Sequence, residues 1–175
     1  MVKGQDVLVL AALMHEKSEM PRFADVAGRA KLSLSETHAA VKRLQAASLV
    51  GSNRRVIRRN VTEFLIHALK YEFPIMASRV LSFGMPTSYA APVAVEEFSI
   101  SGYVPVWPCS TGSVRGLSFE PVYPTVPSAA EADRGMYDRL AVFDMLRAGR
   151  IRERKFAESR LQEMFASCPL RSSSR

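Results

Sequence analysis

The hydrophobic pattern between residues 25 and 50 predicts two short helices joined by a polar turn. In the second helix, expected over 35–47, the apolar positions are three, one and three residues apart, which places them on one helical face. We expect the Ser35 hydroxyl to cap this helix by accepting a free backbone N–H. Leu49-Val50 should then enter a short strand, followed by a turn at 51–53. The apolar positions are Val26, Ala27, Ala30 and Leu32, then Thr37, Ala40, Val41 and Leu44.

The opposite face of the second helix is short and polar, which is typical of a DNA recognition helix. We expect four of its residues to enter the major groove, where Glu36 could accept from a cytosine amino group and His38 could donate to a purine edge. Arg43 could contact either a base or a phosphate. The alternative is a solvent-exposed face with no partner. The four residues are Ser35, Glu36, His38 and Ala39.

Positive charge is concentrated beside this helix. The chain carries a net charge of +7, and its first 60 residues hold eleven Lys/Arg against five Asp/Glu. No acid occurs between residues 40 and 60, so we expect the cations there to hold DNA phosphates, although a solvated basic loop is the alternative. The run 54–59 is too short for a full second strand, which predicts a truncated wing. The expected phosphate contacts are Lys42, Arg54, Arg55, Arg58 and Arg59.

A further helix is predicted over residues 5–17, and Met20-Pro21 should begin the next one. The first helix is apolar on nearly every side, so it must be covered all round. We expect it to pack on the two helices above and also on the C-terminal helices or a second subunit. Asp6 can stabilise its N-terminus through the helix dipole. The apolar positions are Val7, Leu8, Leu10, Ala11 and Met14.

The order helix, helix, helix, strand and turn resembles a winged helix-turn-helix domain of MarR-like bacterial transcription regulators. The resemblance covers about the first 70 residues, although such families commonly have glycine where Lys31 and Ser48 stand here. It implies a homodimer that binds double-stranded DNA, because one recognition helix reads few base pairs. Small regulators and antitoxins that bind a partner protein are also similar. The resemblance rests on Asp25-Val26-Ala27, Leu32-Ser33-Leu34-Ser35, Ala40-Val41-Lys42-Arg43-Leu44 and Ala47-Ser48-Leu49-Val50.

The rest of the chain divides by composition. Asn60 should cap a helix that Pro74 ends, which closes a first domain at 1–73. Residues 74–127 hold eight of the ten prolines and many aromatics, and predict an irregular wrapping segment with strands near 104–107 and 117–122. That segment either covers the core or forms a pocket or docking surface, with Trp107 and Tyr103 as its foremost members.

A helical hairpin is expected over 128–168, as a dimerisation element. Asp133 should cap its first helix, Gly149 should break it, and a second helix should follow over 150–165, before a frayed tail at 169–175. The predicted fold class is therefore mainly α with short β. The first hairpin helix should place Met136, Leu140, Phe143 and Leu146 along one side, and the second Ala157, Leu161, Met164 and Phe165.

No catalytic or cofactor-binding constellation is recognisable. The three histidines are dispersed, no metal-ligand spacing occurs, and Glu96-Glu97 suits a surface, so we expect no enzyme, no cofactor and no metal. Cys109 and Cys168 are expected to be free thiols, with a redox role for Cys109 as the alternative. No signal peptide or membrane span is evident, so a cytoplasmic protein is expected.

Three functions compete on this basis. The first is a sequence-specific DNA-binding regulator, either a repressor or an antitoxin-like autoregulator. The second is a protein-interaction module that uses the same scaffold without DNA. The third is a binder of single strands or RNA, which requires exposed aromatics beside the cations.

Overall fold

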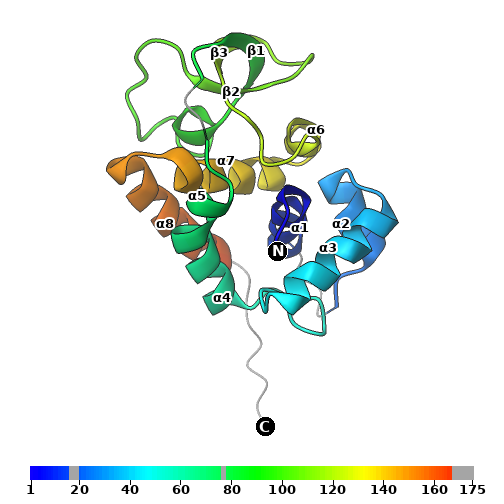
Figure 1. Ribbon diagram of the computed structural model, residues 1–175. Coiled ribbons are helices and arrows are strands. Elements are labelled where there is room, and N and C mark those ends of the chain that lie inside the picture. The colour runs from blue at the N-terminus through cyan, green and yellow to red at the C-terminus, as the bar shows by residue number, and fades with distance from the viewer. Residues whose placement is uncertain (16–19, 76–77, 167–175) are drawn as a thin grey trace.

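Helices make up most of the described chain, and the strands form one small sheet, as the sequence predicts (Figure 1). The computed structural model describes residues 1–15, 20–75 and 78–166. The predicted helix end at 16–17, Cys168 and the tail at 169–175 lie outside the described residues. The elements are α1 (Gly4–His15), α2 (Phe23–Ala30), α3 (Leu34–Ala46), α4 (Arg58–Glu63), a π-helical turn (Phe64–Ala68), α5 (Leu69–Glu72), β1 (Leu81–Pro86), a 3-10 turn (Ser88–Ala90), β2 (Pro105–Pro108), β3 (Val114–Ser118), α6 (Val126–Ala132), α7 (Arg134–Ala148) and α8 (Ile151–Ala166).

Helix α1 is buried on every side within a single chain. Residues 7–12 have no exposed surface, because α2 and α3 cover one side and α7 covers another. The C-terminal part of the same chain therefore supplies the cover that the all-apolar pattern demands. Of the two expected covers, the C-terminal helices are confirmed, and no apolar face of α1 is left for a second copy.

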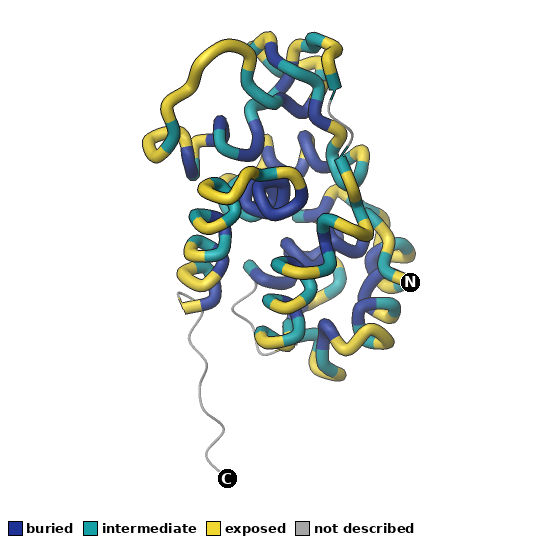
Figure 2. Tube along the Cα trace, turned by 60° about the vertical axis from the view of Figure 1, so that its left-hand side comes forward, coloured by how far each residue is buried: buried dark blue, intermediate teal, exposed yellow. Residues whose placement is uncertain are grey.

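Helix α7 is the second central element, and it contacts α1, α5, α6 and α8 (Figure 1). Its residues from Leu140 to Arg147 are buried, and buried segments are dark blue in Figure 2. Asp133 caps it as predicted, accepting from the backbone N–H of Met136 at 3.1 Å, and the helix ends at Ala148 before Gly149. The predicted hairpin partner is α8, whose inner side buries Ala157, Leu161 and Phe165. The short helix α6, which the sequence did not predict, crosses the expected boundary at 127/128.

The three strands pair with one another in a closed arrangement. Strand β1 runs antiparallel to both β2 and β3, while β2 and β3 pair in parallel. The strands approach so closely that a Cβ on Gly84 would overlap the backbone carbonyl of Trp107. Strand β2 matches the prediction near 104–107, whereas β3 ends at Ser118 and overlaps the strand predicted near 117–122 only at its first two residues. The chain leaves the sheet there because Arg147 holds the Glu120 carbonyl and Pro121 follows.

A buried polar cluster ties the sheet to α7. Trp107 Nε1 and Thr87 Oγ1 donate to Oδ2 of Asp144 at 2.7 and 2.8 Å, and Arg147 Nη1 donates to Oδ1 at 2.7 Å. Arg147 Nε also donates to the carbonyl of Phe73 at 3.1 Å, which fixes the end of α5. Burial raises the pKa of Asp144, and the Arg147 charge with these hydrogen bonds opposes that rise. Trp107, Thr87 and Arg147 all donate to the carboxylate of Asp144, so the cluster fixes the orientation of the sheet relative to α7.

The segment from α4 to α5 is a single helix with a π-helical turn in its middle. Ile57 precedes its first turn, so the predicted cap at Asn60 is wrong. The Asn60 side-chain amide instead donates to the carbonyl of Ser48 at 2.7 Å, just beyond α3. In the π-helical turn, the Ile66 carbonyl accepts from Arg154 of α8 at 3.4 Å. These contacts attach the helix to α3 at one end and to α8 further along.

Candidate nucleic-acid interface

Helix α3 begins one residue earlier than predicted, with Ser33 as its cap. The Ser33 hydroxyl accepts from the Glu36 backbone N–H at 3.2 Å, and the Glu36 carboxylate accepts from the Ser33 backbone N–H at 2.9 Å. This reciprocal capping box satisfies two backbone donors at once. The predicted cap at Ser35 is therefore wrong, and hydrogen bonds from Ser33, then from Tyr123, lower the pKa of Glu36. Glu36 has a structural partner at the position where a cytosine contact was expected.

The outward face of α3 carries three of the expected base-contacting residues and one expected phosphate contact. Ser35, His38 and Lys42 are exposed, and Ala39 is half-buried between them. Thr37, Ala40, Val41 and Leu44 are buried on the opposite face, as the apolar spacing predicts. The outward α3 face, meaning Ser35, His38, Ala39 and Lys42, is thus polar, narrow and held by a packed back.

Arg43 does not belong to this face. Its Nη2 and Nε donate to Oδ1 and Oδ2 of Asp6 on α1, at 2.6 and 2.9 Å. Hydrogen bonding to Asp6 raises the pKa of Arg43. Asp6 is fully buried and the Arg43 side chain is 26% exposed, so the pair lies at the edge of the core. Arg43 therefore locks α3 onto α1, and the base or phosphate contact predicted for it competes with this pair.

Two turns beside α3 adopt left-handed backbone without glycine. Lys31, which ends α2, has φ 54°, and Ser48, which follows α3, has φ 57°. These are the two positions where the resembled families commonly carry glycine, and the chain keeps the conformation with ordinary residues. Such backbone costs about 1–2 kcal/mol for an L-residue, so each turn is strained.

A very short hairpin follows α3. Val50 and Val56 form a single antiparallel bridge, and the Ile57 N–H donates to the Leu49 carbonyl at 2.9 Å. The strand pair is therefore as short as the run 54–59 predicts. Gln45 Nε2 of α3 donates to the Gly51 carbonyl at 3.0 Å, which attaches the turn 51–55 to α3.

Arg54 fixes this turn to α2 as well. Its Nε donates to the Pro21 carbonyl at 2.8 Å, and its guanidinium lies 4.7 Å from the centre of the Phe23 ring. The same ring is 4.7 Å from the imidazole of His38. Arg54, Phe23 and His38 are thus in continuous contact, and the guanidinium of Arg54 has a positioning role that the sequence did not reveal.

The remaining expected phosphate contacts differ in their surroundings. Arg55 is half-buried, and no described residue forms an ion pair with its side chain. Arg58 approaches the Phe165 ring of α8 at 5.8 Å, and Arg59 pairs with Glu63 at 3.3 Å while remaining 87% exposed. An exposed pair of that kind is weak and is easily exchanged for a phosphate. Lys42 and Arg55 are consequently the best-placed cations for an anionic partner.

Side chains from the middle of the chain reach α2 and α3, which local sequence patterns did not indicate. Tyr123 Oη donates to Glu36 Oε1 at 3.5 Å, and Thr125 Oγ1 donates to the Ala30 carbonyl at 3.2 Å. Arg29 of α2 pairs with Asp133 at 2.7 Å. The helices of the candidate interface are therefore fixed from behind by the segment that follows β3.

The aromatic segment has exposed rings but buries its foremost member. Phe83 is 61% exposed and lies across from Arg115 on β3. Trp107 has no exposed surface and its indole N–H donates to Asp144, whereas Tyr103 is 52% exposed. Stacking on bases requires rings that lie open beside the cations. The burial of Trp107 removes the main support for the single-strand hypothesis.

Within the described ranges, no three His, Cys, Asp or Glu side chains gather as a metal site, and no helix has the length and apolar character to cross a membrane. No family model, no curated protein and no solved structure matches the chain. Its function must therefore be inferred from the site itself.

Proposed function

We propose that the protein is a sequence-specific regulator that binds double-stranded DNA through α3. In this proposal α1–α3 and the short hairpin act as a winged helix-turn-helix of the MarR-like kind, with a wing reduced to the turn 51–55. The observation that carries it is the outward α3 face, which is polar and exposed on a helix whose back is packed on α1 and α2. A helix of this form fits the major groove.

Base contacts fall to the small and aromatic side chains of that face. Ser35 and Ala39 are short enough to let the α3 backbone approach the base edges, and Ala39 can contact a thymine methyl group. His38 can donate to a purine, and its ring is oriented by Phe23 at 4.7 Å. Glu36 and Arg43 take supporting roles, because their charges are already satisfied by Ser33 and Asp6.

Phosphate contacts fall to Lys42, Arg55 and Arg59. Lys42 extends from the outward α3 face, while Arg55 and Arg59 follow on the turn and on α4. Arg54 supports them by anchoring the turn to Pro21 and Phe23. Such contacts set affinity and register but carry no sequence information.

A two-fold homodimer remains part of the proposal, because a single α3 reads only a few base pairs. With α1 and most of α7 buried, the exposed side of α8 is the part of the predicted hairpin that is left for a second copy. Sedimentation with and without DNA tests this: the proposal requires two chains per operator, and one chain per specific site contradicts it.

The direct test is binding to the DNA upstream of the protein's own coding sequence. At moderate salt, fluorescence anisotropy should give a Kd at least about 10³-fold lower for the specific fragment than for a shuffled duplex of equal length. His38→Ala should reduce that ratio, since it removes a base contact. Equal affinity for both duplexes at every salt concentration excludes sequence-specific binding.

The alternative is a protein-interaction module on the same scaffold. Exposed apolar side chains favour it, namely Leu34 at 58%, Phe83 at 61% and Tyr103 at 52%. Leu34 begins α3, so a protein partner there would cover the same face as DNA. DNA binding by the purified chain alone separates the two functions, because a regulator binds duplex DNA in the absence of any other protein.

A further inference from the structure

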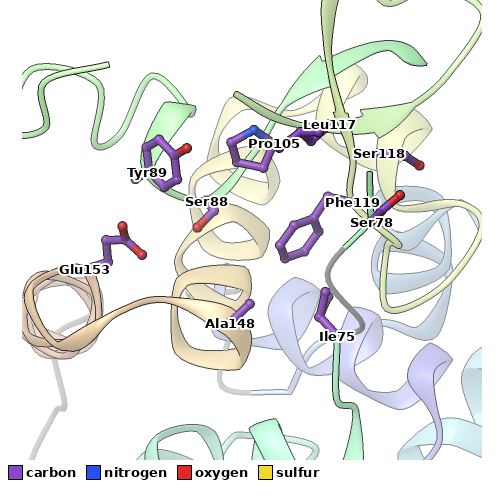
Figure 3. A pocket seen from close by; sticks show the side chains of 10 residues that line it. All are labelled: Ile75, Ser78, Ser88, Tyr89, Pro105, Leu117, Ser118, Phe119, Ala148 and Glu153. Carbon is purple, nitrogen blue, oxygen red and sulfur yellow. The ribbon is translucent and has the colours of Figure 1, made fainter. Parts of the chain in front are cut away.

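A pocket of about 320 Å³ lies between the sheet and the junction of α7 with α8, far along the chain from the outward α3 face (Figure 3). Its volume is at the lower end of the range for small-molecule sites. Strands β2 and β3 form its roof through Pro105 and Leu117, and Ala148 at the end of α7 forms part of its floor. The pocket is thus built from elements that the Asp144 cluster already fixes in place.

One end of the pocket is polar and carries a negative charge. Figure 3 shows Tyr89 and Glu153 on the same side, with the phenol oxygen and the carboxylate directed toward the cavity. Burial, followed by the charge of Glu153, raises the pKa of Tyr89, so the phenol keeps its proton and can donate or accept. Glu153 Oε2 accepts from the Arg150 backbone N–H at 2.8 Å, which orients the carboxylate and leaves it further acceptor sites.

The other end is apolar. The Phe119 ring and the Ile75 side chain face the polar end across the cavity. Ser88 lies between the two ends (Figure 3). Phe119 is only 8% exposed and is held from behind by the guanidinium of Arg147 at 5.9 Å. An occupant therefore meets a fixed aromatic wall at one end and a carboxylate with a phenol at the other.

The side chains of the polar end are also fixed from outside. The Tyr89 ring packs edge-on against Phe98 at 6.4 Å, and Phe98 packs against Phe156 of α8 at 5.4 Å. Arg152 lies 5.6 Å from the centre of the Phe98 ring. Arg150, whose charge opposes the rise in the pKa of Tyr89, lines with Arg152 an adjoining cavity that shares Tyr89 and Glu153. Glu153 is the single charged side chain among the described residues that line the cavity.

We propose that this pocket binds a small primary amine that carries an aromatic or branched apolar group. The ammonium group would donate to Glu153 and Tyr89, and the apolar group would pack on Phe119 and Ile75. A buried or half-buried carboxylate without a cation in the same cavity favours a positively charged partner. The apolar end, with Phe119 and Ile75, sets the shape of the rest of the molecule.

The test uses 2-phenylethylamine as the probe, with 2-phenylethanol and 3-phenylpropanoate as neutral and negative analogues of similar size. Calorimetric titration of the full chain should show the amine binding, the alcohol binding at least about tenfold more weakly and the carboxylate not binding. Glu153→Gln, which keeps the acceptor for Arg150, should weaken amine binding by at least about tenfold. Glu158→Gln, on the same helix but outside the pocket, should leave it unchanged.

Ala148→Phe provides a second and charge-independent check, because it fills the floor of the cavity. It should abolish amine binding while the thermal unfolding of the variant stays cooperative. The proposal is overturned if the amine fails to bind at millimolar concentration, if the carboxylate binds as tightly as the amine, or if both pocket variants bind like the natural chain. None of these measurements involves DNA, so their outcome is independent of the proposed regulator function.

Discussion

Arg43 and Asp6 form a two-bond ion pair across the contact between α3 and α1. Nη2 donates to Oδ1 at 2.6 Å and Nε donates to Oδ2 at 2.9 Å, although the residues are 37 positions apart. Asp6 also accepts from the Lys3 backbone N–H at 2.8 Å, which places the carboxylate at the first turn of α1. The orientation of α3, the candidate recognition helix, relative to α1 is thus set by Arg43 of α3 itself.

Loss of this pair should destabilise the fold. Arg43→Ala leaves a fully buried carboxylate without its cation, so unfolding free energy should fall by about 2–4 kcal/mol. Urea denaturation measures the change. Lys42→Ala, one position earlier and exposed, should change stability by less than about 0.5 kcal/mol. Equal effects at the two positions mean that the pair contributes nothing to the fold.

The hydrogen bond from Trp107 to Asp144 predicts a second stability effect. Trp107→Phe removes one of the donors to a fully buried carboxylate, at a cost of about 1–3 kcal/mol, in addition to the smaller ring. Circular dichroism during denaturant unfolding measures this without relying on the indole. Tyr103→Phe, at an exposed ring outside the cluster, is the matched control and should be close to neutral. A loss no larger than that of the control contradicts the role of the cluster.

Asp133 gives the fold a defined acid sensitivity. Burial alone would raise the pKa of Asp133, but the Met136 N–H, His15 and Arg29 outweigh burial and lower this pKa below its ordinary value. The native chain therefore binds this proton less readily than the unfolded chain does, so the stabilisation is complete above about pH 4 and is lost as pH falls through the lowered pKa.

Asp133→Asn isolates that charge, because asparagine keeps an N-cap acceptor. At pH 7 the variant should be less stable by about 1 kcal/mol, and the difference should shrink toward zero in acid below the native pKa. Urea denaturation across this pH range checks the prediction. A difference that stays constant with pH would assign the effect to packing instead of charge.

The left-handed turns at Lys31 and Ser48 predict stabilising substitutions. Each glycine variant, Lys31→Gly or Ser48→Gly, relieves backbone strain and should gain about 0.5–1 kcal/mol after the entropy of the unfolded glycine is counted. Gly102→Ala should have the opposite sign, since Gly102 has φ 75° and open space around it. Thermal unfolding of the three variants tests the prediction, and a loss of stability at both Lys31 and Ser48 refutes it.

Local periodicity was sufficient to predict the buried faces of the helices, but not the caps and tertiary contacts that connect them. The steps between Thr37, Ala40, Val41 and Leu44 correctly give the buried face of α3, because one helical face can be derived from the chain alone. The cap was misplaced by two residues, although Ser33 followed by Glu36 three positions later is the capping-box pattern and was available in the sequence.

The partners of charged residues could not be predicted in the same way. Arg43 and Glu36 resemble groove-facing residues on a helical projection, and only the tertiary fold brings Asp6 and Tyr123 to them. Strand β1 was missed because Gly84 and Pro86 are poor strand formers, whereas its glycine is required by the close approach to Trp107. Asp144 and Arg147 of α7 are likewise buried, although helical periodicity alone would assign charged residues to the surface.

The salt dependence of DNA affinity tests the proposed interface most directly. For the natural chain and three single variants, anisotropy with the upstream duplex gives the slope of log K against log salt concentration. Lys42→Ala and Arg55→Ala should each reduce that slope by about 0.9, the value expected for one lost phosphate contact, and weaken binding to all sequences alike. Arg115→Ala, an exposed cation on β3, should leave the slope unchanged. Identical slopes for all four proteins would contradict DNA binding through α3 and the turn that follows it.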